Sequence, residues 1–472
     1  MPAIAGEGRA VRVPGHHCPC AQADRLAKWT VFANVWVFKS VPSPRSIVGY
    51  FLCAACVAAP LAADEAPAPA VTSAAVTDLA RSAERELRGD ILPFWLKYTR
   101  NPANGGYYGL ITADMTVKAG VPRGALLTSR ILWTFSTAYR VYGDLAYLEM
   151  ARWAYRDLMD HFWDQEYGGL YWTIAADGTP MDVHKQIYGQ VFGVYALAEF
   201  YRATGEPRAL DEAIAIYTLI EAHARDRAYG GYIDALDRSW ARLGTQRNLL
   251  GGAPKSQNSH IHILEAYTEL LRVWPDPGLR DNQRALVETT LQHIIDPDTH
   301  HLILFMKDDW TPIGDEVSFG HDIELSWLLV EAAQVLGDPA LVARVKPISL
   351  DIAKVTLAQG VDPDGGVLNE GGPHGLTNTG KDWWPQAEAA VGFLNAYQLS
   401  GDAQYFRASR HSWDFIQAKF VDRVHGDWIE SVARDGTPLP RPKVSLWKCP
   451  YHSGRSCFEL IERLHELDQA AP

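Results

Sequence analysis

The chain has 472 residues, a formal net charge of −12 and no run of basic residues, which argues against a nucleic-acid partner. Hydrophobic residues make up 47% of the sequence, enough for a large core, and the 16 Trp and 20 Tyr are unusually many. Flat aromatic side chains suit the C–H faces of sugars but also fill cores, so composition alone is a weak indication of a carbohydrate ligand.

Residues 1–75 do not resemble the rest of the chain. Arg45 precedes a short apolar run from Ile47 to Ala59, which is followed by small residues up to Ala63 and by an Ala/Pro-rich stretch. This order predicts a secretory signal at about 45–63, too short for a membrane span, although the preceding residues are more than an ordinary signal carries. We expect a periplasmic or secreted protein with no membrane contact in its mature form. A cytoplasmic protein with a disordered leader is the alternative.

The six cysteines lack the spacing of a metal site. Four of them lie at positions 18, 20, 53 and 56, and the other two are Cys449 and Cys457. We predict free thiols, no zinc site and no other metal site.

From about residue 78 onward the chain repeats itself. Each repeat contains a short β-like segment with turn residues, which follows one helical pattern and precedes another. The stretches 144–160 and 207–224 are examples of the helical patterns. These repeats predict an all-α (α/α)6 barrel of six helix-hairpin repeats with short β-hairpin loops, in one domain at 78–466. An open solenoid would need polar capping repeats, which we do not find. A Gly-Gly pair or a looser copy of it marks the repeats every 60 to 71 residues, at Gly106, Gly169, Gly231, Leu302, Gly366 and Gly426.

A group of polar and aromatic residues opens the helix that follows each of these positions. Equivalent positions in a closed ring face the same central cavity, so we predict that the groups line one pocket. A single Trp at such a position more often fills a core, and it is the recurrence that indicates function. The groups contain, in chain order, Arg130, Tyr188, Asn258 with His262, His321 with Glu324, Trp384 with Glu388, and Trp447 with His452.

The stretch from Ser318 to Ala333 predicts a helix that Ser318 caps, because its apolar residues recur at helical spacing. His321 and Glu324 are three residues apart and therefore share a face in its first turns. The positive end of the helix dipole favours the neutral, proton-accepting form of the imidazole.

Other histidines also lie near helix starts. Asn258 and His262 are four residues apart and share a face, whereas His260 points elsewhere and is predicted to be structural. We expect the last helix at 455–467, which leaves His452 in the loop before it.

Five sequence strings together resemble those of cellobiose 2-epimerases, which belong to the N-acylglucosamine 2-epimerase superfamily of (α/α)6 barrels. The resemblance runs from about residue 78 to the end. It implies an isomerase that epimerises C2 of the reducing-end glucose of β-1,4-linked disaccharides, from cellobiose to glucosyl-mannose and from lactose to epilactose, with no cofactor. The strings are Ser129–Ser136, Asn258–His262, Gly320–Glu324, Lys381–Glu388 and Trp447–His452.

The resemblance also implies roles for individual residues. Inversion at C2 needs ring opening, removal of the C2 proton and its return on the opposite face, which calls for two acid/base groups of near-neutral pKa. His321 and His452 match this pair, and His262 matches a third histidine that assists ring opening. Arg130 and His262 would stabilise the enediolate, and Glu324 would hold a hydroxyl or orient His321. The other implied substrate contacts are Trp384 and Trp447, stacked on the two sugar rings, with Tyr188, Asn258 and Glu370.

Three other functions remain open. An aldose–ketose isomerase of the same superfamily would form the same enediolate but return the proton to C1. A glycoside hydrolase would need two carboxylates, which Glu324, Glu370 and Glu388 could supply, but its histidines would be idle. A non-catalytic sugar-binding barrel is the third. For the epimerase we expect a monomer whose partner is the disaccharide substrate.

Overall fold

A computed structural model describes residues 70–243 and 252–470 of the chain. The predicted leader up to residue 69, with its signal-like segment at about 45–63 and four of the cysteines, lies outside the described residues. Export therefore stays a prediction. None of the helices in the described ranges is both long enough and apolar enough to cross a membrane.

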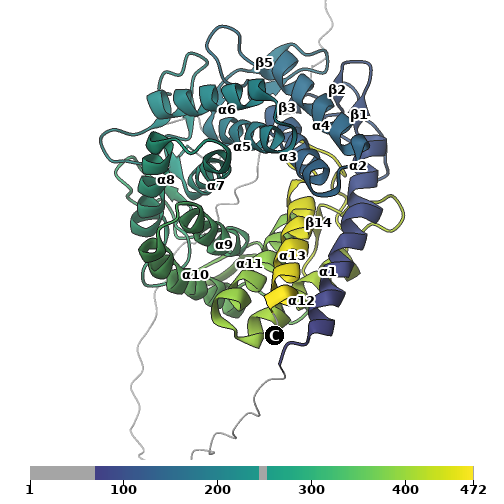
Figure 1. Ribbon diagram of the computed structural model, residues 1–472, viewed down its shortest axis with the longest axis vertical. Coiled ribbons are helices and arrows are strands. Elements are labelled where there is room, and N and C mark those ends of the chain that lie inside the picture. Colours follow the sequence, from purple (N-terminus) through teal and green to yellow (C-terminus); the bar gives the residue numbers. More distant parts are fainter. Residues whose placement is uncertain (1–69, 244–251, 471–472) are drawn as a thin grey trace, which may run out of the picture. The chain divides into compact units, whose positions relative to one another are not determined.

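Two concentric rings of helices form the fold (Figure 1). The inner ring consists of α3 (Ala125–Tyr142), α5 (Ile187–Thr204), α7 (Gln257–Val273), α9 (Phe319–Val335), α11 (Trp383–Ser400) and α13 (Tyr451–Ala470). The outer ring consists of α1 (Ser73–Glu86) with α2 (Leu92–Tyr98), α4 (Leu145–Asp157), α6 (Pro207–Leu219), α8 (Pro277–Thr289), α10 (Pro339–Gln359) and α12 (Ala403–Lys419). Each inner helix packs against the next, and α13 packs against both α3 and α1. The ring is closed, and the predicted (α/α)6 barrel is confirmed.

The sequence separates the two rings by how much of each helix is apolar. Helix α5 is buried without interruption from Ile187 to Phe200, as expected for a helix surrounded by others. The buried side chains of α8 form a single stripe that includes Leu279 and Leu286, and its other faces are polar. The predicted patterns at 144–160 and 207–224 are outer helices, α4 and α6, which continue into the π-helical turns η2 (Leu158–Phe162) and η3 (Ile220–Ala224). Similar turns, η1 (Leu87–Ile91) and η4 (Thr290–Ile294), follow α1 and α8.

Short turns lead from each inner helix to its outer partner. Gly143 ends α3 in the left-handed conformation with φ 70°, which glycine adopts without steric cost. Asp144 follows directly and caps α4 by accepting a hydrogen bond from Ala146 N–H. Gly401 and Asp402 repeat the arrangement between α11 and α12, so this pair of residues is a local signal for the turn.

Small antiparallel sheets link neighbouring repeats on one end of the barrel. Each pairs the strand before an inner helix with the strand after the following outer helix. The bridge between Ile111 and Val444 joins the first loop to the last, so the loop layer closes as the helices do. The pairs are β3 (Arg123–Gly124) with β4 (Thr173–Ile174) and β5 (Pro180–Asp182), β6 (Lys185–Gln186) with β7 (Ala235–Leu236), β8 (Lys255–Ser256) with β9 (Phe305–Met306), β10 (Val317–Ser318) with β11 (Glu370–Gly372) and β12 (Gly375–Asn378), and β13 (Lys381–Asp382) with β14 (Ser431–Val432). A further pair, β1 (Arg100–Asn101) with β2 (Gly106–Tyr107), follows α2.

The structure moves the predicted start of the barrel and corrects one predicted helix boundary. The first helix begins at Ser73, a few residues before the expected start of the barrel at 78, because Thr72 caps it through Ala75 N–H. The last helix begins at Tyr451 instead of residue 455. Gly454 N–H donates to the Pro450 carbonyl at 2.8 Å, so a helical turn forms directly after the proline. His452 therefore lies on the first turn of α13 and not in a loop.

Buried ion pairs fix the loop layer onto the helices. Lys185 Nζ donates to Asp164 Oδ2 at 2.9 Å and to the Gly168 carbonyl at 2.8 Å, and the side chains of Lys185 and Asp164 are both 0% exposed. The same Lys–Asp arrangement recurs in other repeats as Lys255–Asp226, Lys381–Asp362 and Lys443–Asp422. Each lysine thus holds the aspartate of the Gly-Gly turn that precedes it.

Replacing Lys185 with Ala should leave Asp164 buried with one cationic partner fewer. Asp164 keeps two hydrogen bonds from Arg238, so the substitution removes one buried partner without leaving the charge unpaired. The free energy of unfolding from urea denaturation should therefore fall by about 1–3 kcal/mol. The control is Arg344→Ala, which removes an exposed pair with Glu288 and should cost at most about 1 kcal/mol. Similar losses in both variants would contradict a stabilising role for the buried pair.

Candidate active site

A cavity of about 300 Å³ opens at the end of the barrel where the inner helices begin. It contains nine of the ten predicted site residues, one or more from each inner helix. Its lining consists of Arg130, Tyr188, Asn258, His262, His321, Glu324, Asp382, Trp383, Trp384, Glu430, Trp447 and His452. These nine residues from the recurring groups thus line one cavity, whereas Glu388 of the same groups does not line it, and the roles implied for them stay predictions. Asp382, Trp383 and Glu430 were not predicted, although the first two belong to the same sequence string as Trp384.

Glu370 is the predicted residue that does not line this cavity. It lies on β11, directly opposite Ser318 of β10, and its Oε2 accepts a hydrogen bond from Asn378 Nδ2 at 3.1 Å. The structure therefore does not place Glu370 with the other predicted site residues.

A larger cavity of about 430 Å³ lies at the opposite end, between the last turns of the inner helices. Its charged side chains are largely paired with one another, as in Arg140–Glu199 at 2.7 Å and Arg272–Glu269 at 2.8 Å. None of the predicted site residues lines it. We therefore assign the chemistry to the smaller cavity.

Three histidines of the smaller cavity are held through their Nδ1 atoms. His262 Nδ1 lies 2.9 Å from Glu265 Oε2, and His452 Nδ1 lies 2.7 Å from Glu388 Oε1. Because an ionised carboxylate only accepts, both rings carry their proton on Nδ1 and keep the Nε2 lone pair free to act as a base.

His321 has a different partner. Its Nδ1 lies 2.9 Å from the Ser318 hydroxyl, which can donate or accept a hydrogen bond. Ser318 occupies the N-cap position of α9 as predicted, but its side chain does not bond a backbone N–H of the helix. The predicted side-chain cap is therefore wrong, and the hydroxyl is used to hold the imidazole.

Burial keeps all three imidazoles neutral. It lowers the pKa of His321 to about 3, with a further decrease from nearby His262. The pKa of His452 lies well below its usual range because of burial and of the positive charges on Arg130 and Arg455. Burial also lowers the pKa of His262, and the bond to Glu265 only partly offsets this. Each ring is thus neutral in the resting protein and keeps one ring nitrogen unprotonated.

Aromatic rings line the cavity at two depths. The Trp384 ring lies 4.7 Å from the His321 ring and 5.7 Å from the His452 ring, measured between centroids. Trp447 is 36% exposed and lies 5.9 Å from the Tyr188 ring. The indole of Trp384 is therefore partly buried beside two histidines, and that of Trp447 is more exposed to the solvent.

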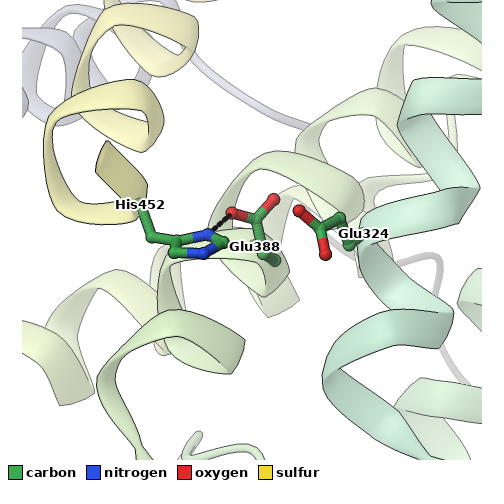
Figure 2. Close-up of side chains that lie close together, drawn as sticks. All are labelled: Glu324, Glu388 and His452. Atoms are coloured by element: carbon green, nitrogen blue, oxygen red, sulfur yellow. Dashed lines mark hydrogen bonds and ion pairs between the residues drawn. The ribbon is translucent and has the colours of Figure 1, made fainter. Parts of the chain in front are cut away.

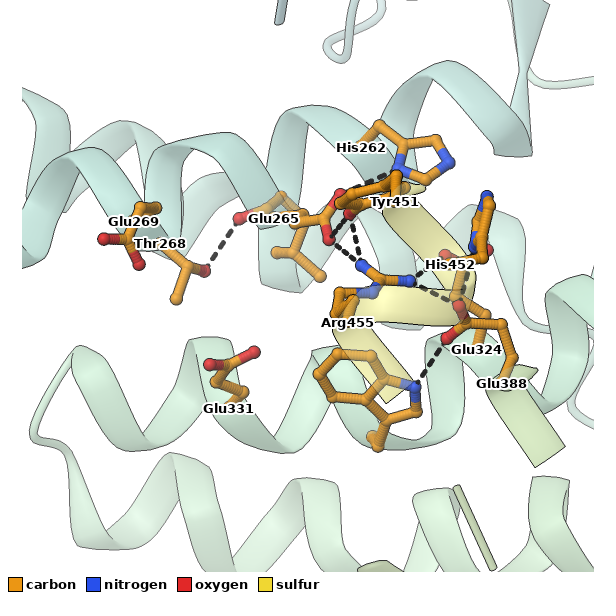
Figure 3. Close-up of polar contacts among 12 residues, drawn as sticks. His262, Glu265, Thr268, Glu269, Glu324, Glu331, Glu388, Tyr451, His452 and Arg455 are labelled. Carbon is orange, nitrogen blue, oxygen red and sulfur yellow. Dashed lines mark hydrogen bonds and ion pairs between the residues drawn. The ribbon is translucent and has the colours of Figure 1, made fainter. Parts of the chain in front are cut away.

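A buried guanidinium lies beneath the histidines (Figure 3). Arg455 Nη2 donates to Glu324 Oε1 and to Glu388 Oε1, both at 2.7 Å, and Nη1 contacts Glu265 and the Tyr451 hydroxyl. Arg455 thereby connects the carboxylates that hold His262 and His452.

Sequence reasoning missed Arg455 and Glu265, although a signal was present. On α7, α9 and α13 a cavity histidine is followed three residues later by a charged residue, in the pairs His262/Glu265, His321/Glu324 and His452/Arg455. Residues three apart lie one above the other on a helix, so each histidine has a charged group one turn deeper. The recurrence of this spacing predicts a charged layer below the histidines.

One group in this layer has the composition of a metal site (Figure 2). Ligand atoms of Glu324, Glu388 and His452 all lie within 4.8 Å of one another. Two of these carboxylate oxygens already accept hydrogen bonds from Arg455, and one of them also bonds His452. The guanidinium therefore supplies the positive charge that a metal ion would otherwise bring, and the group fits an ion poorly.

A family model, curated proteins and solved structures all match most of this chain. The family model described as N-acylglucosamine 2-epimerase (GlcNAc 2-epimerase) matches residues 106–453. A cellobiose 2-epimerase from Bacteroides fragilis is 43% identical over 391 residues, which cover 81% of this chain and 98% of that protein. The structure of a cellobiose 2-epimerase from Bacillus thermoamylovorans is 38% identical with a TM-score of 0.78, covering 82% of this chain and 100% of that one. The structure of a cellobiose 2-epimerase from Spirochaeta thermophila is 37% identical with a TM-score of 0.75, covering 83% of this chain and 98% of that one.

His260 and His262 should respond differently to substitution. His260 accepts from Tyr232 N–H at 3.0 Å and bonds the Ser256 carbonyl through Nδ1 at 2.7 Å, so it fixes the loop and not the cavity. His262→Ala should lower turnover by orders of magnitude with little change in thermal stability. His260→Ala should mainly lower the melting temperature.

A matched variant tests the structural assignment of His260. Gln190 occupies the corresponding fourth position of its inner helix and bonds both N–H and C=O of Leu170. His260→Gln should therefore be more stable than His260→Ala. Loss of turnover in both His260 variants with unchanged folding would contradict the assignment.

Proposed function

Because this chain belongs to the N-acylglucosamine 2-epimerase family, we propose that it epimerises C2 of the reducing-end glucose of β-1,4-linked disaccharides. Cellobiose would give glucosyl-mannose, and lactose would give epilactose. The observation that carries the proposal is the convergence of three neutral histidines on one cavity, two of them against a single indole ring. High identity to cellobiose 2-epimerases over nearly their full length supports the disaccharide as the substrate.

The first chemical step is opening of the reducing-end ring. It requires a proton to leave the O1 hydroxyl and a proton to reach O5 as the C1–O5 bond breaks. His262 is the group proposed for this step, since its Nε2 is left free by the bond from Nδ1 to Glu265. The product is the open-chain aldehyde.

The second step is transfer of the C2 proton. One of His321 and His452 takes the proton from C2, and the other delivers a proton to the opposite face of the planar intermediate. In the reverse direction they exchange roles. Both rings lie against Trp384, so the reducing-end sugar is proposed to bind there.

The enediolate formed in between needs donors near O1 and O2. Arg130 lines the cavity, and its Nη2 already donates to the Tyr188 hydroxyl at 2.7 Å, so the two side chains form a fixed donor unit. Loss of one such donor typically costs about 10²–10³ in rate. Asn258 is placed on the same wall as His262 and is proposed to bind a sugar hydroxyl.

The second sugar ring is proposed to lie toward the solvent, on Trp447. That side chain is partly exposed at the cavity while Trp384 lies deeper, which matches two subsites in series. Glycoside hydrolysis is less compatible with this arrangement. Glu324 and Glu388 bind the same nitrogen of Arg455, which leaves no space for a glycosidic bond between them.

Incubation with cellobiose in deuterated water tests the proposed reaction directly. Glucosyl-mannose should form and carry deuterium at C2, because the histidines exchange their protons with solvent before returning them. Product separation by chromatography with mass spectrometry distinguishes the alternatives, since an aldose–ketose isomerase gives a ketose and a hydrolase gives monosaccharides. An epimer without deuterium at C2 would exclude the two-histidine mechanism.

Replacing either His321 or His452 with Asn should remove one side of the proton transfer. Epimerisation should fall to near background in both variants. Each remaining histidine can still remove and return a proton on its own face, so C2 exchange with deuterated water should survive for one epimer only. The two variants should show opposite preferences for glucose-type and mannose-type reducing ends, measured by NMR. The same preference in both would place the two histidines on one face.

A further inference from the structure

Three buried carboxyl groups surround the single guanidinium of Arg455. Glu265 is fully bonded, because it accepts from Arg455 and from the Tyr451 hydroxyl through one oxygen and from His262 through the other. Glu388 also accepts hydrogen bonds at both oxygens, from Arg455 and His452 at Oε1 and from Trp327 Nε1 at Oε2, the last at 3.1 Å.

Glu324 differs from the other two. Its Oε1 accepts from Arg455, but its Oε2 has no hydrogen-bond partner among the described residues. The side chain is 1% exposed in the barrel yet lines the cavity. Oε2 is therefore a buried oxygen without a partner in a residue that lines the cavity.

The charges in this layer do not balance if all three carboxyl groups are ionised. With the histidines neutral, three negative charges would surround Arg455, and the only other cation among the described residues that line the cavity is Arg130. One carboxylate would then lack a cationic partner in a site shielded from water, which is costly.

The group with the fewest hydrogen bonds is the one that takes up a proton most readily. Burial and the charge on Glu388 raise the pKa of Glu324 to about 8. For Glu265 the effect of burial is outweighed by Arg455 and His262, and its pKa is lowered.

We propose that Glu324 is a neutral carboxylic acid in the resting protein, and that its Oε2–H donates a hydrogen bond to the enediolate oxygen. The inference rests on the proposed epimerisation. Oε1 is bound to Arg455, so the proton sits on Oε2. One histidine still takes the proton from C2 and the other delivers a proton to the opposite face, and the Glu324 proton stays on its oxygen.

A neutral acid suits this position for an electrostatic reason. A carboxylate would repel the negative charge that develops on the sugar oxygens, whereas a carboxylic acid stabilises it at the moment it forms. Glu324 also lies one turn below His321 on α9, and thus beside one of the two groups proposed to act at C2. Arg455 acts here as a positioning residue, since it holds the carboxyl group by its other oxygen.

Substitution by glutamine separates a neutral donor from a carboxylate. Glutamine is uncharged, similar in shape and able to donate from Nε2. Glu324→Gln should therefore lower kcat/KM by less than about tenfold, whereas Glu324→Ala should lower it by about 10²–10³ as expected for a lost oxyanion donor. Equal losses in the two variants would overturn the proposal.

Glu388→Gln and Glu265→Gln are the matched controls. These carboxyl groups are proposed to be ionised and accept hydrogen bonds through both of their oxygens, whereas an amide has only one acceptor oxygen. Each should lose more activity than Glu324→Gln. The reverse order would show that the proton resides on one of them.

Infrared spectroscopy detects the proton without any need for activity. The difference spectrum between wild type and Glu324→Gln near neutral pH should contain a carboxylic-acid C=O band, which disappears as pH rises through about 8. If the Gln variant does not fold, Glu324→Asp provides the comparison through a shifted band. Absence of the band would overturn the proposal. Failure of wild type to epimerise cellobiose would instead overturn the proposed function and leave the band in place.

Stability provides a further readout. The pKa of Glu324 is raised above its value in the unfolded chain, so between pH about 4.5 and 8 the unfolded state binds fewer protons and stability falls as pH rises. Glu324→Gln should lack this part of the decline, and an unchanged pH profile would count against a protonated Glu324. The groups that face Glu324 and set its titration are Arg130 on α3, Tyr188 on α5, His262 and Glu265 on α7, His321 on α9, Glu388 on α11, and Tyr451, His452 and Arg455 on α13.

Discussion

The guanidinium of Arg455 is the interaction on which the site depends. It is 1% exposed and joins α13 to α7, α9 and α11 through Glu265, Glu324 and Glu388. Burying this charge is costly unless it is paired, and three carboxyl groups accept hydrogen bonds from its two terminal nitrogens. In return, the carboxylates that hold His262 and His452 cannot rotate away, because their other bonds run to the same cation. One buried charge thus fixes the orientation of two imidazoles on two different helices.

The same arrangement affects the relative base strengths of His321 and His452, the two histidines proposed to act at C2. A carboxylate stabilises an adjacent imidazolium more than a hydroxyl does, so Glu388 alone would make His452 a stronger base than His321, which has Ser318. Arg455 opposes this, because it shares the Glu388 oxygen that His452 uses. We infer that the cation reduces the difference between the two bases. An epimerase benefits from such a balance, since each histidine must be the acceptor in one direction and the donor in the other.

Much of the architecture could be predicted because it follows from the spacing of residues that are close in the sequence. The Gly-Gly turns and helical patterns repeat, and a closed ring then brings equivalent positions such as Arg130 and His452 to one cavity. What could not be predicted depends on contacts between distant segments. Nothing near Glu370 in the sequence indicates that it pairs with Ser318, and nothing near Arg455 shows three carboxyl groups around it. The start of α13 was misplaced for a local reason, since a proline and a glycine on either side of His452 resemble a loop but form a first helical turn.

The helix that closes the ring also carries part of the site. Helix α13 carries both His452 and Arg455, and it is the last inner helix of the chain, yet its outer partner α1 is the first. The two ends are joined by contacts such as the bond from Ser73 Oγ to Asp468 Oδ1 at 2.5 Å and by the bridge between Ile111 and Val444. Until these segments meet, Glu265, Glu324 and Glu388 lack the guanidinium that they share. The contacts that close the ring therefore also bring His452 and Arg455 to the cavity, so one helix both closes the fold and completes the site.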